Sequence, residues 1–368
     1  MQENRLKISV LGDICPVQNR ELFAFSLSEA DVIVGNLECV LSDQPTPVKK
    51  TGPVLSAPVA FASMLKRFGF SALSLANNHI RDCGDEGVRS TITACLHSGM
   101  VTFGAGIDET AASEPFIIEG NGLKVAFLSF AEKEFNYIHK SKAGALAFDP
   151  YASLDLITQV RKSVDALIVL YHGGIEHYIY PSPLLQKKCR AMVQAGADVV
   201  LCQHSHCIGT REQYNGKEIL YGQGNCVFGY RPDNDAWNRG LIANVVVTSS
   251  TVSVEYQVLE MNEDGLSHLA SEKVSKMILS QIEVESSNVL DNGILKERWK
   301  KFCKEKQSLY LPMLLGFSKN STRLNRILRN GLVKTLYTRR QLNIANNIIR
   351  CDSHREVIET ILGEWEFD

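Results

Sequence analysis

The stretch "VVLCQHSHCIGTREQ", Val199 to Gln213, joins an apolar, strand-forming run to two histidines, His204 and His206. Side chains two residues apart in a strand point to the same side, so these imidazoles can converge on one point where the strand ends. A His-X-His pair also occurs on ordinary exposed strands, and the motif alone is compatible with a metal site and with plain surface. Its meaning depends on which other side chains gather at the same place.

Strand-like and helical patterns alternate along the rest of the chain. Strand-like runs cover 6–13, 30–38, 71–79, 165–174 and 197–206, and helical spacing covers 61–70, 85–100, 154–164 and 184–196. Residues 115–130 predict a hairpin that turns at Asn121-Gly122. Further strands at 217–228, 240–250 and 251–260 predict antiparallel pairing. The pattern indicates an α/β fold with a mixed or second sheet.

Composition predicts a cytoplasmic protein. The 368 residues carry a net charge of −2, and no apolar run is long enough to span a bilayer. The N-terminal "MQENRLKISVLGD" lacks the apolar core of a secretory signal. The ten cysteines are scattered without a CxxC pair, which favours a reducing compartment over a disulfide framework.

Polar residues recur where the predicted strands end. They are Asp13, Glu38, Asn78, His79, His172, His204 and His206. In open α/β sheets ligands gather at the carboxyl ends of the strands, and mixed oxygen and nitrogen donors suit Mn, Fe or Zn. Each position also has a plain alternative: a turn or cap for Asp13, a solvated charge for Glu38, and an Asx turn with a packed histidine for Asn78-His79. Their common location favours a metal site.

The same residues stand in an ordered pattern, "GD…NLE…LSLANNHIRDCG…HGGIE…GADVVLCQHSH…ILYGQGNCVF". This pattern resembles the poly-gamma-glutamate capsule-synthesis (CapA-like) protein family over roughly residues 5 to 260. That family is similar to calcineurin-like metallophosphoesterases. The resemblance implies a four-layer αββα sandwich that holds two divalent metal ions.

The resemblance also implies a role for each residue. The implied metal ligands are Asp13, Glu38 in place of a bridging aspartate, Asn78, His172, and His204 and His206 on one metal each. The implied catalytic residues are His79, which assists the leaving group, Asp82 and Glu176. Glu176 either supports a ligand or faces the substrate, and Asp82 and Asn225 fit the role of orienting ligands.

One position departs from the wider superfamily. Cys15 stands in "GDICP" where classical members have a histidine two residues after the first aspartate. Its thiolate would favour Zn or Fe. The alternative, which we prefer, is that Cys15 is a small buried apolar side chain.

The implied activity is metal-assisted hydrolysis of a phosphomonoester or phosphodiester, in bacterial capsule or cell-surface polysaccharide metabolism. The alternative is a weakly catalytic or non-catalytic metal-containing assembly factor that binds an anionic polymer such as poly-gamma-glutamate. A third hypothesis, amide hydrolysis or transfer on a glutamyl polymer, has the least chemical support. The intact "NNH" motif favours catalysis, because a structural metal site has no need of His79.

The C-terminal part differs in charge. We divide the chain into a metallophosphoesterase-like domain, 1–260, and a basic helical domain, 261–368. Residues 296–350 hold fourteen Lys/Arg against Glu297 and Glu305, a net charge of +12, so the rest of the chain carries −14. Helical spacing on both sides of an apolar stretch broken by Pro312 predicts basic amphipathic helices. These helices either neutralise the acidic domain or contact an anionic partner. Among such partners the inner membrane surface and an anionic glycan rank above nucleic acid.

Overall fold

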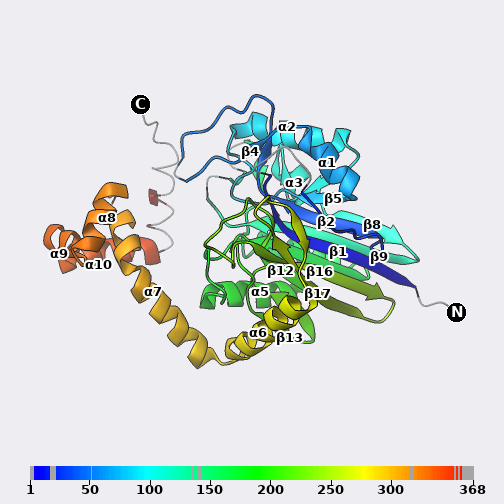
Figure 1. The fold of residues 1–368 in the computed structure, drawn as a ribbon. Helices are drawn as coiled ribbons and strands as arrows, with labels where there is room; N and C mark the ends of the chain where they lie inside the picture. Colours follow the sequence, from blue (N-terminus) through cyan, green and yellow to red (C-terminus); the bar gives the residue numbers. More distant parts are fainter. Residues whose placement is uncertain are drawn as a thin grey trace. The chain divides into compact units, whose positions relative to one another are not determined.

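The computed structural model describes residues 4–16, 22–50, 52–134, 136–138, 142–314, 316, 319–351, 354 and 357–358. The chain divides into two compact units, Met1–Leu295 and Lys296–Asp368. The first unit contains both principal sheets of the described chain and the second contains helices (Figure 1).

The larger sheet is parallel on one side of β1 and antiparallel on the other. Its spatial order is β18 (Ser267–Leu269), β17 (Val252–Met261), β16 (Arg239–Thr248), β1 (Arg5–Ile14), β2 (Val32–Leu37), β5 (Ala72–Ser74) and β6 (Val101–Phe103). The strands β1, β2, β5 and β6 run parallel, whereas β16, β17 and β18 pair antiparallel. A short strand, β15 (Asn225–Val227), joins the end of β1 in parallel.

The second sheet has a parallel centre and antiparallel edges. Its order is β13 (Arg211–Tyr214), β14 (Lys217–Leu220), β12 (Val199–Gln203), β11 (Ala166–His172), β9 (Leu123–Ala131) and β8 (Phe116–Gly120). The predicted hairpin is confirmed, since β8 and β9 pair antiparallel around Asn121 and Gly122, both at positive φ. Antiparallel pairing throughout 217–260 is wrong, because β14 lies parallel to β12 and β15 parallel to β1.

Helices cover the outer face of each sheet (Figure 1). Helices α1 (Phe61–Phe68) and α2 (Gly84–His97) pack on the larger sheet, and α4 (Ala152–Arg161) and α5 (Pro183–Ala195) pack on the second. Shorter elements complete the unit: α3 (Glu109–Ser113) and the two-stranded pairs β3 (Val40–Leu41) with β4 (Ser56–Ala57) and β7 (Ala105–Gly106) with β10 (Gly144–Ala145). The order helix, sheet, sheet, helix is the predicted αββα sandwich.

Alternation along the strands builds three apolar cores. In β1, Val10 packs between the two sheets while Leu11 packs under α1 and α2. In β11, Ile168 and Leu170 face the other sheet, and Val169 faces α4 and α5. Because successive side chains point to opposite faces, strands covered on both sides must be apolar at nearly every position. Most buried polar residues therefore lie near the strand ends, and the exception in β1, Ser9, donates a hydrogen bond to Asn244 at 2.7 Å.

The boundary between the units lies later than the sequence placed it. After residue 260, β18 extends the larger sheet, and α6 (Glu272–Leu290) buries Ile278 and Ile282 in the core between the sheets. Ser286 of α6 also accepts a hydrogen bond from the backbone N–H of Arg211, at 2.8 Å. These contacts bind residues 261–295 to the first unit.

The second unit is helical. Helix α7 (Asn292–Leu314) begins four residues before Lys296 and contains Pro312, so the break predicted at this proline is wrong. It is followed by α8 (Lys319–Ile327), α9 (Gly331–Leu336) and α10 (Arg339–Arg350). No helix in the described part of the chain is long and apolar enough to cross a membrane.

Stability should depend on the core between the two sheets. Leu170 is fully buried there, and we expect Leu170→Ala to lower the free energy of unfolding by about 2–5 kcal/mol, because it removes apolar contacts and leaves a cavity. Chemical denaturation measures this change. The control is Leu184→Ala on α5, where the side chain is 60% exposed; a loss as large as that of Leu170→Ala would contradict the layered core.

Candidate metal centre

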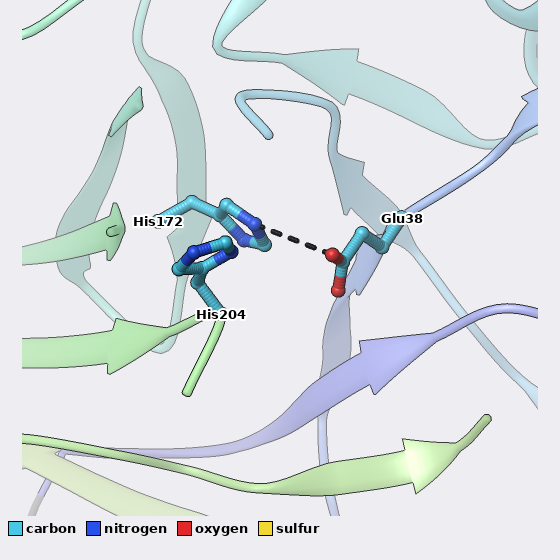
Figure 2. A group of neighbouring side chains, drawn as sticks. All are labelled: Glu38, His172 and His204. Carbon is cyan, nitrogen blue, oxygen red and sulfur yellow. Dashed lines mark ion pairs between the residues drawn. The ribbon is translucent and has the colours of Figure 1, made fainter. Parts of the chain in front are cut away.

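Most of the predicted site residues come together at one edge of the sandwich, where the carboxyl ends of strands from both sheets lie. Asp13 lies near the end of β1, Glu38 directly follows β2, and Asn78 and His79 follow β5. From the second sheet, His172 ends β11, while His204 and His206 follow β12. Figure 2 shows Glu38 opposite His172 and His204, with side chains from the two sheets pointing toward one another.

Asp13 is placed by a close approach of two backbones. A Cβ at Gly12 would lie 2.1 Å from the carbonyl oxygen of Gly224, so only glycine permits this contact. The fully buried Asp13 carboxylate accepts hydrogen bonds from Asn36 Nδ2, at 2.8 Å, and from the backbone N–H of His204, at 3.0 Å. Burial, and then the neighbouring Glu38, raise the pKa of Asp13 to about 7.

Glu38 is the centre of the cluster. Its Oε1 lies 3.5 Å from His172 Nε2, 3.8 Å from His206 Nε2 and 4.0 Å from His79 Nε2. Neither carboxylate oxygen has a hydrogen-bond partner among the described residues, although the side chain is fully buried. Burial, followed by the negative charges of Glu176 and Asp82, raises the pKa of Glu38 well above its usual range. A buried carboxyl group in these surroundings is either protonated or paired with a cation.

Burial keeps three histidines of the cluster neutral. Burial lowers the pKa of His172 to about 4, that of His204 to about 3 and that of His206 to about 2. His204 and His206 lie beyond the end of β12, at φ values of 87° and 51°. A turn with left-handed backbone therefore brings the two imidazoles to the site, in place of the strand periodicity that the sequence suggested.

Asparagines fix the direction in which two imidazoles face. Asn225 Nδ2 donates to the Trp237 carbonyl, which leaves Asn225 Oδ1 as the acceptor for Nδ1 of His206, at 2.9 Å. Because Nδ1 of His206 carries the proton, its Nε2 keeps a lone pair toward Glu38. His172 Nδ1 lies 3.2 Å from Asn36 Nδ2, and its Nε2 lies 2.9 Å from Asn78 Oδ1. The predicted orienting role of Asn225 is consistent with this geometry, whereas sequence reasoning assigned no role to Asn36.

Two overlapping groups of ligand atoms result. Glu38, His172 and His204 form one group, and Asp13, Glu38 and His206 form the other; within each group the ligand atoms lie within 4.8 Å of one another. Glu38 belongs to both groups. The unpartnered Glu38 oxygens and the unpartnered Nδ1 of His204 fit metal ligation, because buried polar atoms are otherwise hydrogen-bonded. Carboxylate and imidazole donors suit Mn, Fe or Zn.

His79 is oriented by a buried ion pair. Its Nδ1 lies 2.7 Å from Asp82 Oδ2, and Asp82 also pairs with Lys50, whose side chain is 5% exposed. The backbone N–H of His79 donates to Asn77 Oδ1 at 3.1 Å. Lys50 comes from the Pro-rich loop 45–58, and no sequence signal pointed to it; Asn77 stands in the "NNH" motif, but sequence reasoning assigned it no role of its own.

Two other predicted residues lie outside the buried group. The Glu176 side chain is 54% exposed in the loop after β11, near His177, so it is not brought into the cluster. Cys15 packs beside Cys39 in the core under α1 and α2 and is in neither ligand group. The structure therefore favours the packing interpretation of Cys15 over thiolate ligation.

Sequence comparisons identify relatives of the chain. The family model of the bacterial capsule synthesis protein PGA_cap matches residues 20–230. The capsule biosynthesis protein CapA of Bacillus anthracis is 30% identical over 222 residues, which are 58% of this chain and 53% of that protein. The PGA biosynthesis protein CapA of Bacillus subtilis is 29% identical over 215 residues, 57% of this chain and 55% of that protein. The chain thus spans about half the length of these relatives.

More distant similarities appear among other proteins. A probable polyglutamine synthesis accessory protein of Mycobacterium tuberculosis is 30% identical over 171 residues, 43% of this chain and 45% of that protein. Among solved structures, a hypothetical protein from Thermus thermophilus aligns with a TM-score of 0.45 and 12% identity, over 69% of this chain and 99% of that chain. A 5'-nucleotidase from Candida albicans aligns with a TM-score of 0.42 and 12% identity, over 78% of this chain and 59% of that chain.

The pKa of Asp13 predicts a pH dependence of stability in metal-free protein. The folded-state pKa is about 7 against 3.8 for the free side chain. The unfolded chain therefore releases this proton first, and the contribution of Asp13 to stability is full below pH 3.8 and is lost as pH rises through 7. Between pH 3.8 and 7 the unsubstituted protein should lose stability, whereas Asp13→Asn cannot titrate at this position. The free energy of unfolding of Asp13→Asn minus that of the unsubstituted protein should therefore rise over this pH interval. Chemical denaturation with a chelator present measures it, and a difference that does not change with pH would contradict the shift.

Proposed function

We propose that the chain, which belongs to the family of the bacterial capsule synthesis protein PGA_cap, holds two divalent metal ions and hydrolyses a phosphoester. The observation that carries this proposal is the position of Glu38 in both ligand groups. One carboxylate shared between two cations is the arrangement that places metals a few ångströms apart for phosphoryl transfer. The proposed substrate is a phosphomonoester or a phosphodiester.

The six proposed metal ligands come from both sheets. Glu38 bridges, Asp13 and His206 belong to one site, and His172 and His204 belong to the other. Asn78 joins the second site, because its Oδ1 lies beside Nε2 of His172. When bound, Mn, Fe or Zn ions would neutralise phosphate oxygens and lower the pKa of the attacking water.

His79 supplies the proton for the leaving oxygen. Asp82 accepts from Nδ1 of its ring, which leaves Nε2 directed toward the cluster, 4.0 Å from Glu38 Oε1. Lys50 holds the Asp82 carboxylate in place from the other side. A histidine oriented by a carboxylate is suited to general acid catalysis. Glu176 lies at the exposed loop beyond the buried ligands, where it would face substrate.

The proposed setting is bacterial capsule or cell-surface polysaccharide metabolism. This setting rests on the names of the relatives, which are a capsule biosynthesis protein and a PGA biosynthesis protein. A second candidate function is an accessory role in which the metal site captures an anionic polymer such as poly-gamma-glutamate with little turnover. The name of the Mycobacterium relative, a probable synthesis accessory protein, favours this alternative.

The first test is metal content together with hydrolysis of an aryl phosphate ester. We expect about two transition-metal ions per chain, and His204→Ala and His206→Ala should each lower this number. His79→Ala should retain the metals and lose about 10²- to 10⁴-fold in kcat, because it removes the proton donor and no ligand. Elemental analysis and a steady-state assay measure the two quantities. His97→Ala, at an exposed position on α2, is the matched control.

The outcomes separate the two functions. No metal after incubation with Mn, Fe and Zn would refute the dinuclear site and both functions that depend on it. Metal at full occupancy without turnover on monoesters or diesters, combined with metal-dependent binding of poly-gamma-glutamate, would establish the accessory function instead.

A further inference from the structure

The C-terminal unit is strongly basic, and many of its cations are exposed. Residues 296–350 carry a net charge of +12 within a chain of −2. Arg323, Arg326, Arg329, Arg339 and Arg340 are exposed. Among the residues that the structure describes, none of these five arginines is paired with a carboxylate. Unpaired cations at this density attract an anionic partner.

Helix α8 adds an apolar stripe to this charge. Leu324 and Ile327 of α8 are 48% and 77% exposed, and their spacing of three residues places them on one side of the helix. Leu328, in the turn directly after α8, is 47% exposed. Arg323 and Arg326 flank them in the sequence. Large apolar side chains gathered on an exposed face mark an interaction surface.

The other side of α8 is already occupied. Thr322 and Asn325 are buried, and Asn325 binds α9: its Oδ1 accepts from the backbone N–H of Val333 at 3.1 Å, and its Nδ2 donates to Asn330 Oδ1 at 3.0 Å. At 100° per residue, Thr322 and Asn325 lie opposite Leu324 and Ile327. The packing of α8 on α9 therefore turns the apolar stripe outward, and the next helices add exposed Leu336 and Ile344.

This combination distinguishes between anionic partners. A soluble polyanion such as a polypeptide, a glycan or a nucleic acid is attracted by the arginines but provides no apolar phase for Ile327. A bilayer with anionic headgroups provides both, because basic amphipathic helices bury their apolar face at the boundary between headgroups and acyl chains. We infer that the C-terminal unit docks peripherally on an anionic lipid surface through the α8 stripe and its flanking arginines.

The test is sedimentation of the full chain with vesicles. The vesicles contain phosphatidylcholine alone or with about one third phosphatidylglycerol. We expect binding to the anionic vesicles only, and weaker binding at high salt. Arg323→Gln/Arg326→Gln should lower the partition coefficient about thirty-fold, because each cation near the surface contributes to attraction. Leu324→Ser/Ile327→Ser should lower it by at least as much.

Two controls keep the result interpretable. Arg67→Gln/Arg89→Gln changes the same charge at exposed positions of the first unit and should leave binding unchanged. Circular dichroism checks that each variant remains helical. Absence of binding at low salt would overturn the inference, as would an equal loss in the Arg67/Arg89 variant. Binding unaffected by Leu324→Ser/Ile327→Ser, together with equally tight binding of poly-gamma-glutamate by that variant, would make a soluble polyanion the partner.

Discussion

The buried carboxylate of Glu38 is the constraint around which the first unit is organised. It is fully buried, has no hydrogen-bond partner among the described residues, and stands near the second buried carboxylate, Asp13. Burial penalises ionisation of both carboxyl groups: it raises the pKa of Asp13, to which the charge of Glu38 adds, and it raises the pKa of Glu38, to which the charges of Glu176 and Asp82 add. Neutral imidazoles at 3.5 and 3.8 Å do not relieve this penalty. A cation would relieve it, so the geometry of the cluster suits the metal site that we propose.

The sandwich determines where this cluster can form. Strands such as β1 and β11 are covered on both faces, and their successive side chains enter different cores. A polar side chain in their middle costs free energy unless it finds a partner, as Ser9 finds Asn244. A group of charged and polar side chains fits at the carboxyl ends of the strands, where the two sheets come together. The close backbone contact at Gly12 and the left-handed turns at His204 and His206 then direct the side chains inward.

The sequence located the candidate site where predicted strands end in charged residues or histidines. Apolar runs ending in Asp13, Glu38, His172 and the histidine pair located the site, because carboxyl ends of strands converge. Lys50 was missed, since a lysine in a loop has no spacing that links it to His79. Asn77 belongs to the "NNH" motif, but its hydrogen bond to the backbone of His79 becomes visible only in the structure. The exposure of Glu176 depends on its loop, and the attachment of α6 depends on contacts of Ile278 and Ile282 with distant strands. No local pattern encodes such long-range packing.

Under the two proposals, the two units would recognise anions in different ways. Beside the cluster, Lys50 is paired with Asp82, and Arg231 stacks on Trp237, whose ring centroid lies 4.7 Å from that of His206. Because these cations already have partners, an anionic substrate at the site would be attracted chiefly by the metal ions that we propose there. On α8 the exposed arginines provide the attraction directly, together with apolar side chains. Recognition at the cluster should therefore respond to metal removal, whereas recognition by the C-terminal unit should respond to ionic strength, which screens exposed charges most.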